Sequence, residues 1–207
     1  MKKTQTLGIM ALSIFMLAPH AQAQDIKPYI GIGGGVFALQ YKESGLGYSI
    51  SQRNPTWGAF LKGGADFNEY VGAEVRLGMT GNPATDWPTG TLGSVVPFRI
   101  STKIDNFVSY LLKVGTPVGS ESHIHAYIGG TTAKVTGTLS VSGLNFGESS
   151  TKTGVTFGAG YDFTIGDNAK LGLEWIEYWT DVNLGSTGGS VAKGSFRGLS
   201  ATIKMTF

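Results

Sequence analysis

Cysteine is absent from the sequence, so oxidation of thiols plays no part in the fold in any compartment. Charge is scarce as well: 14% of the residues are charged, whereas soluble domains have about 25%. The formal net charge is only +2, and Lys2 and Lys3 account for an excess of this size. The remainder of the chain is close to neutral, which argues against nucleic-acid binding and against a polybasic membrane arm.

Long apolar runs are also lacking. After residue 23 no segment approaches the roughly 20 apolar residues that a membrane-spanning helix needs. At the start of the chain, Lys2 and Lys3 precede a shorter apolar stretch at residues 7–18, and Ala21-Gln22-Ala23 forms an A-x-A cleavage site. This order of features predicts a secretory signal peptide at residues 1–23 and one mature domain at residues 24–207.

The chain has a two-residue period instead. Near its end, alternate positions are apolar, and the positions between them are small or polar; the apolar ones are Leu199, Ala201, Ile203, Met205 and Phe207. This alternation predicts a strand with one apolar face. A secreted chain without a spanning helix can cross lipid only as a closed β-barrel, because every backbone N–H and C=O must be paired there. The pattern therefore predicts a protein of the cell outer membrane.

The same period predicts eight strands, at residues 29–41, 56–67, 70–79, 104–115, 123–135, 152–164, 169–180 and 196–207. Between them, long loops are predicted at residues 42–55, 80–103, 137–151 and 181–195, and short turns near residues 68–69, 116–122 and 165–168. Outer-membrane barrels have short periplasmic turns and long extracellular loops. The predicted fold class is all-β: an eight-stranded antiparallel up-and-down transmembrane β-barrel with both ends in the periplasm.

A soluble eight-stranded barrel of the lipocalin kind would show the same alternation, with apolar side chains inside and charged ones outside. The composition of the polar positions argues against it, because they hold many glycines and only a few charges of both signs. Glycine is abundant, at 32 of 207 residues, against a usual fraction of about 7%. In a narrow membrane barrel, glycine relieves crowding inside the wall.

Five short segments resemble the transmembrane barrel of the OmpA-type family. They are Gly63-Gly64-Ala65-Asp66-Phe67-Asn68-Glu69-Tyr70-Val71-Gly72-Ala73-Glu74, Lys113-Val114-Gly115-Thr116-Pro117-Val118, Ile128-Gly129-Gly130, Gly160-Tyr161-Asp162-Phe163 and Leu173-Glu174-Trp175. The resemblance covers about residues 28–207. Nothing follows Phe207, so we expect no peptidoglycan-binding domain. The terminal phenylalanine resembles the signal that the barrel assembly machinery reads in small barrels of this kind.

The interior of an eight-stranded barrel is about wide enough to be filled by side chains. The polar parity predicts an interior charge network of four cations and four anions: Lys62, Asp66, Glu74, Arg76, Lys113, Asp162, Glu174 and Lys204. In the resembled family an acid at the Glu74 position pairs with a base at the Lys113 position and gates a narrow water path. A second base of that network falls at Gly172 here, and Arg76 or Lys62 is a candidate to replace it. We hypothesise a Glu74–Lys113 pair; the network either gates a path or only fills the lumen.

Aromatic residues gather near the predicted strand ends, where girdles form at the two membrane interfaces. The predicted girdle comprises Trp57, Phe163, Trp175, Trp179 and Phe207, and Phe37, Tyr41 and Tyr178 lie at similar positions. Glu177 falls on the lipid-facing parity. Either a bulge near residues 175–178 or a position above the outer interface would explain this charge.

No enzyme site, metal site or cofactor is predicted. After removal of the signal only His123 and His125 remain as histidines, and a nucleophilic site needs a base within reach of its serine. Ser122 is adjacent to His123, so the two side chains would point to opposite faces of a strand. His-x-His alone supplies too few ligands for a metal site. The glycines of residues 31–35 lie inside a strand and lack the lysine of a phosphate-binding loop.

The expected function is structural or surface-interactive, in the manner of an adhesin, through four extracellular loops. Residues 80–103 form the longest predicted loop, and they include Trp87, Pro88, Pro97 and Phe98. This loop either contacts a surface ligand or folds down over the barrel mouth. The alternative function is a narrow ion or solute channel, and a lipid A-modifying enzyme is the third. The expected partners are membrane lipid, lipopolysaccharide, the barrel assembly machinery and a surface ligand at the loops, with no nucleic acid.

Overall fold

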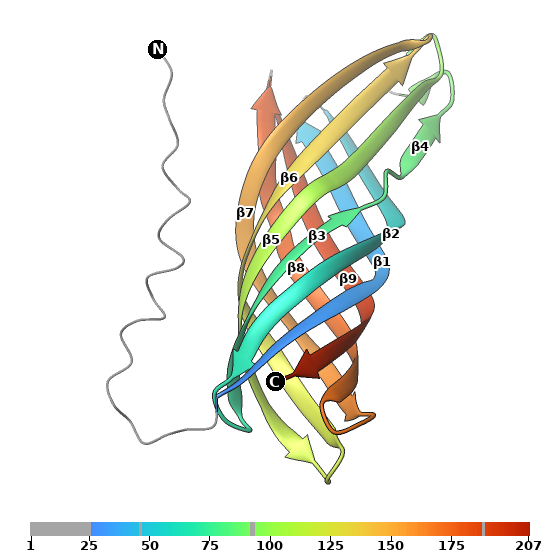
Figure 1. Cartoon of the computed structure of the whole chain (residues 1–207). Coiled ribbons are helices and arrows are strands. Elements are labelled where there is room, and N and C mark those ends of the chain that lie inside the picture. The colour runs from blue at the N-terminus through green and yellow to red at the C-terminus, as the bar shows by residue number, and fades with distance from the viewer. Residues whose placement is uncertain (1–25, 46, 92–93, 188) are drawn as a thin grey trace, which may run out of the picture.

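The computed structural model describes residues 26–45, 47–91, 94–187 and 189–207, so the predicted signal peptide lies outside the described residues. The described part of the chain is almost entirely strand (Figure 1): β1 Lys27–Gly45, β2 Tyr48–Asp66, β3 Val71–Thr80, β4 Ala84–Trp87, β5 Phe98–Val118, β6 Ser122–Val141, β7 Leu144–Thr164, β8 Ala169–Thr187 and β9 Ser190–Thr206. It contains no helix long and apolar enough to span a membrane.

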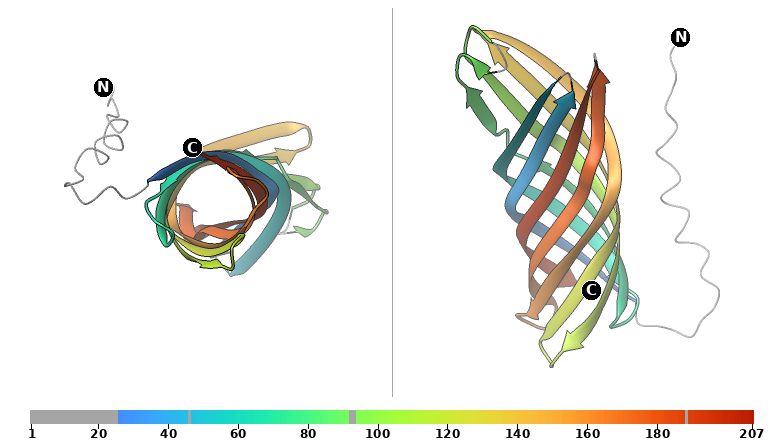
Figure 2. Two further views of the ribbon diagram at one scale, coloured as in Figure 1. Left: turned by 60° about the horizontal axis from the view of Figure 1, so that its bottom comes forward. Right: turned by 180° about the vertical axis from the view of Figure 1, so that it is seen from behind.

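The strands close into a barrel. Their order is β3-β2-β1-β9-β8-β7-β6-β5-β4, and β3 also pairs with β5. Every neighbouring pair is antiparallel. β3 and β4 pair with successive parts of the same strand, β5, so the nine strands occupy eight positions of the wall. The predicted all-β, eight-stranded antiparallel barrel is confirmed, and the end-on view of Figure 2 shows the closed ring.

The apolar parity of the strands faces outward. Ile32 is 55% exposed, Leu61 61% and Leu77 54%, and the residues that alternate with them point into the barrel. Exposed large apolar side chains all around a soluble wall would be costly. They suit the lipid that surrounds a transmembrane barrel, whose outer surface is an apolar band.

The predicted long loops are the main error of the sequence-based account. Residues 42–55, 137–151 and 181–195 continue the strands as hairpins almost to their tips, and residues 80–103 include β4 and the start of β5. Their Ser, Thr and Gly residues are typical of loops, but across β6 and β7 the hydroxyl side chains pair with each other, as in the Thr136–Ser149 bond of 2.7 Å. The short turns are confirmed, at residues 67–70, 119–121 and 165–168.

The wall is continuous only over its lower half, at the end that holds Lys27 and Thr206. β2 pairs with β3 only from Gly58 to Asp66, and β7 pairs with β8 only from Phe157 to Thr164. Toward the hairpin tips the barrel therefore divides into two sheets, one of β2, β1, β9 and β8, the other of β4, β5, β6 and β7. We call the second one the outer sheet; it comprises residues 84–87, 98–104, 135–141 and 144–156 (Figure 1).

Candidate functional site

The barrel interior holds all eight charged residues that the sequence places there, in two groups. The first group, the central cluster, consists of Lys62, Glu74, Arg76 and Glu174, none more than 4% exposed. Arg76 joins both acids: its Nε lies 2.5 Å from Glu74 Oε1, and its guanidinium lies 2.8 Å from Glu174 Oε2. Lys62 Nζ lies 2.7 Å from Glu174 Oε1 and 3.8 Å from Glu74 Oε2. Each buried charge thus faces charges of opposite sign, which offsets the cost of taking it out of water.

Aromatic side chains complete the central cluster. Tyr29 donates a hydrogen bond of 2.8 Å to Glu74 Oε2, and Tyr127 donates one of 3.0 Å to Glu174 Oε1. The guanidinium of Arg76 also lies over the rings of Phe60 and Tyr127, at 4.9 and 4.8 Å from their centres. Cation–π contacts of this kind add to the ion pairs where water is excluded.

The hypothesised Glu74–Lys113 pair is wrong. Lys113 forms its ion pair with Asp66 instead. The reason is the cross-strand register: Gly72 of β3 pairs with Asp66 of β2 on one side and with Lys113 of β5 on the other. Gly72 has no side chain, so the two charged side chains meet across it. Glu74 is neutralised by Arg76 and Lys62. Arg76 and Lys62, which were both considered as replacements for the missing base, are thus both partners of Glu74.

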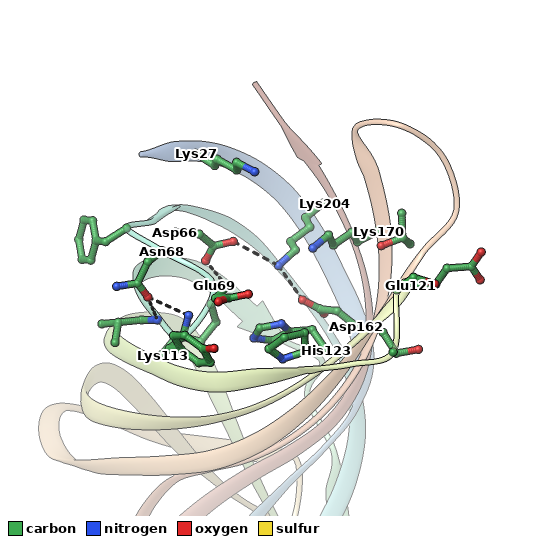
Figure 3. A pocket seen from close by; sticks show the side chains of 18 residues that line it. Lys27, Asp66, Asn68, Glu69, Lys113, Glu121, His123, Asp162, Lys170 and Lys204 are labelled. Atoms are coloured by element: carbon green, nitrogen blue, oxygen red, sulfur yellow. Dashed lines mark hydrogen bonds and ion pairs between the residues drawn. The ribbon is translucent and has the colours of Figure 1, made fainter. Parts of the chain in front are cut away.

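The second group, the end cluster, consists of Asp66, Lys113, Asp162 and Lys204. Lys204 Nζ lies 2.6 Å from Asp162 Oδ2 and 4.0 Å from Asp66 Oδ2. These residues line a cavity of about 620 Å³ at the end of the barrel that holds Lys27 and Thr206. Figure 3 shows Lys27, Glu69, Glu121 and Lys170 around the same cavity. The lining of the cavity includes the paired charges of the end cluster and no residue of the central cluster.

Among the described residues, one group of side chains comes within metal-ligand spacing. His125, Asp162 and Glu174 are buried, with candidate ligand atoms within 4.8 Å of one another. The ring nitrogens of His125 have no hydrogen-bond partner, and Nδ1 lies 3.9 Å from Asp162 Oδ2. Both carboxylates are already neutralised by lysine or arginine. A divalent cation would thus add two positive charges to a balanced interior, at a large cost in free energy.

Between the central cluster and the hairpin tips, an aromatic layer fills the lumen. Its members are fully or almost fully buried: Phe37, Phe107, Tyr178 and Phe196, each at most 1% exposed. The ring centre of Phe107 lies 5.0 Å from that of Tyr178, 5.6 Å from that of Phe196 and 6.2 Å from that of Phe37. This layer was not predicted. The alternation of the strands could have revealed it, because Phe37, Phe107 and Phe196 lie at the alternate positions that point into the barrel.

Glycine on the neighbouring strand makes room for one of these rings: Gly78 of β3 is the cross-strand partner of Phe107. A Cβ atom on Gly78 would overlap the ring of Phe107, so no other residue fits there without a shift of the ring. The predicted use of glycine, to relieve crowding inside the wall, is confirmed at this position. The ring and the glycine together leave the lumen closely packed.

The predicted girdle position of Trp179 is wrong, because its side chain is 0% exposed and packs inside the barrel against Phe196, with ring centres 5.5 Å apart. The strand register shifts between Glu177 and Trp179, which is the bulge considered for this region. The bulge turns Trp179 inward. Glu177 stays on the outer parity, where its Oε2 lies 3.7 Å from Arg197 Nε.

The other predicted girdle residues lie on the outside of the wall. Trp57 is 74% exposed, Trp175 43%, Phe163 42% and Phe207 71%. Phe157 packs edge-to-face on Trp175, with ring centres 6.0 Å apart. Of the further aromatics named with them, Phe37 and Tyr178 belong to the buried layer instead, because both lie on the inward parity of their strands.

Ser122 and His123 do not come together. The hydroxyl of Ser122 accepts a hydrogen bond of 2.6 Å from Tyr161, which is 43% exposed on the outer face. His123 points the other way and lines the end cavity (Figure 3). The arrangement follows from the alternation of side chains along a strand.

The outer sheet carries an apolar patch that crosses its four strands. Directly paired residues of a sheet share one face, and two rows meet here: Trp87–Phe98–Val141–Leu144 and Thr85–Ile100–Leu139–Phe146. At its outermost strand the patch is open to solvent, since Leu144 is 63% and Phe146 60% exposed. At the other end of the patch, Trp87 is partly buried and stacks on Phe98, with ring centres 6.2 Å apart.

On the opposite face of the outer sheet, an ion pair joins β4 to β5. Arg99 donates two hydrogen bonds to the carboxylate of Asp86, of 2.6 and 3.0 Å. These bonds hold the pKa of Asp86 below its usual range. β4 is therefore held to β5 as a strand of the outer sheet.

Comparison with known protein families fits this architecture. Residues 7–205 match the model of the outer membrane protein beta-barrel domain. The chain belongs to this family. It is accordingly a protein of the cell outer membrane, as the signal and the strand pattern predict. No curated protein matches the sequence.

Several solved barrels are similar in fold. OprG of Pseudomonas aeruginosa, an outer membrane protein, is 13% identical with a TM-score of 0.51, over 87% of this chain and 96% of that one. The Neisserial surface protein A is 15% identical (TM-score 0.49, 87% and 97% covered). The attachment invasion locus protein Ail of Yersinia pestis is 17% identical (TM-score 0.42, 85% and 97% covered). At these identities the likeness shows the fold alone.

Proposed function

We propose that this barrel is a surface-interaction protein that binds its ligand through the apolar patch of the outer sheet. The observation that carries the proposal is the exposure of Leu144 and Phe146 at the end of the barrel opposite to Lys27 and Thr206. Contiguous exposed apolar side chains on a paired sheet mark an interaction site, because leaving them in water is unfavourable. With the short turns in the periplasm, as in outer-membrane barrels generally, this patch lies on the extracellular side of the membrane.

The filled lumen supports a surface role over transport. Phe60 joins the aromatic layer to the central cluster: its ring centre lies 6.5 Å from that of Phe37, and the guanidinium of Arg76 lies over the ring at 4.9 Å. A conducting path would need a continuous line of water past Phe107 and Arg76, which are 1% and 0% exposed. The gated channel is therefore the second candidate, favoured only by the cavity at the terminal end.

Replacing Leu144 and Phe146 together by serine is expected to reduce ligand binding about tenfold or more, because burial of each side chain stabilises a complex by roughly 1.5–3 kcal/mol. Bacteria that display the protein are counted on surfaces coated with extracellular matrix. Thr151→Ala changes the opposite face of the same strand and is expected to bind like the wild type. Heat-modifiable gel mobility verifies that each variant is a folded barrel.

A deletion tests the patch in a second way. Removal of residues 81–96 takes away β4 and with it Trp87, and it is also expected to lower binding. If the double serine variant and the deletion both bind matrix as well as the wild type does, the patch is not the binding site.

The remaining partners belong to the same proposal. The outward apolar band would contact membrane lipid and lipopolysaccharide, and the exposed Phe207 would serve the assembly machinery during insertion. Phe207 is 71% exposed, and its N–H donates to the carbonyl of Pro28 at 3.0 Å. The terminal ring is therefore held at the wall with its side chain free to be recognised.

A further inference from the structure

One strand edge of the outer sheet is open and regular. Residues 144–156 of β7 pair with β6 along their whole length without a register shift. On its other side, β7 pairs with β8 only from Phe157 onward. Side chains of β8 still lie against Gly154, where Trp179 and Val182 pack, and Thr156 donates a hydrogen bond to the carbonyl of Tyr178. Among the described strands, none pairs with residues 144–153 of β7 on that side. Such an edge presents backbone N–H and C=O groups that are ready to accept another strand.

The other strand at this gap is protected. The outer half of β8 has three register shifts, between Glu177 and Trp179, Trp179 and Val182, and Asn183 and Gly185, and Asp181 has a φ of 49°. Bulges twist an edge away from further pairing. The corresponding edge of β2 contains Pro55, which has no N–H, and Asn54 accepts a hydrogen bond of 2.8 Å from Thr85 of β4. β7 thus lacks the protection that these two edges have.

The charges of the β7 edge are complementary to those of an identical edge on a second copy. Its outer half contains only two, Glu148 and Lys152, and neither belongs to an ion pair among the described residues. They lie on the same face about 13 Å apart, too far to pair within one strand. When residues 147–153 of a second copy pair antiparallel with the same residues about Ser150, Glu148 of each copy lies opposite Lys152 of the other. Opposite charges at such positions stabilise a strand pair.

We propose that the β7 edge binds the same edge of a second copy of this protein, across a two-fold axis at Ser150. Antiparallel pairing within one sheet reverses the strand direction, so the second barrel is turned upside down relative to the first. Two barrels in one membrane point the same way, and the pair therefore joins two membranes that face each other. The contact is a homophilic one between cells, and it rests on the proposed surface function.

The test uses the refolded mature chain in lipid vesicles, with aggregation followed by light scattering. Wild-type vesicles aggregate. Vesicles with Glu148→Lys alone, or Lys152→Glu alone, are expected to aggregate about tenfold more slowly, because each contact then has two repulsive pairs and vesicles join through many contacts. A mixture of the two single variants regains the wild-type rate, since every charge at these two positions then faces a charge of opposite sign on the other variant. Glu69→Lys, at the opposite end of the barrel, leaves the rate unchanged.

Three results would overturn the proposal: wild-type vesicles that stay dispersed, single variants that aggregate as fast as the wild type, or a mixture that stays as slow as its components. A wild-type protein that stays dispersed but still binds matrix through the patch refutes self-association and leaves the proposed function standing. Capture of an extended segment of a different protein at the β7 edge, without vesicle aggregation, also refutes the second copy as occupant. Gel mobility verifies folding of every variant.

Discussion

Replacement of Arg76 by alanine is expected to lower the free energy of unfolding by about 3–5 kcal/mol, the cost of leaving buried partner charges uncompensated. Its guanidinium bridges Glu74 and Glu174, which lie on different strands, and it is 0% exposed. Without it, Lys62 alone faces two carboxylates. The loss is measured by urea unfolding of the barrel in vesicles, followed by gel mobility.

Two further variants distinguish charge imbalance from lost packing. In the Arg76→Ala, Glu174→Ala double variant one orphaned acid is removed, so the loss is expected to be smaller than the sum of the two single losses. Arg99→Ala breaks an ion pair of similar geometry that is exposed to solvent, and no measurable loss is expected. Additive losses in the double variant would mean that Arg76 and Glu174 are not coupled.

Replacement of Phe107 by alanine is expected to cost about 3–5 kcal/mol, as large-to-small changes of buried aromatic residues do. The ring lies against Phe37, Tyr178 and Phe196, and the facing glycine, Gly78, has no side chain that could fill the space. Lipid cannot enter the interior to replace the lost contacts. The cavity is therefore expected to persist.

Phe146→Ala is the matched control for this substitution. The ring of Phe146 is 60% exposed on the outer sheet, so its removal is expected to change stability by no more than a few tenths of a kcal/mol. Urea unfolding under the same conditions compares the two variants. Equal losses would contradict the assignment of Phe107 to a packed layer.

The period of two was sufficient to predict the barrel, because lipid outside and a narrow lumen inside impose opposite preferences on alternate residues. The same parity placed Lys62 and Arg76 inside the barrel. It did not give their partners. Which acid meets which base depends on the stagger between strands, and stagger is set by cross-strand register, as Lys113 and Asp66 illustrate.

Two features escaped prediction for physical reasons. A bulge adds a residue without changing composition, so the alternation around Trp179 gave the wrong side. The outer sheet escaped because hydroxyl-rich segments pair as strands above a membrane when their register lets Ser and Thr bond across, as Ser140 does with Asn145. The patch of Leu139, Leu144 and Phe146 becomes visible only once that register is known.

Single-channel recording of the refolded mature chain in planar bilayers tests the central claim most directly. If the lumen is closed by the aromatic layer and the function lies at the surface, the membrane stays silent while gel mobility verifies a folded barrel. Discrete current steps that change when Glu74 is replaced by alanine would contradict this account, because they require a water path through the central cluster.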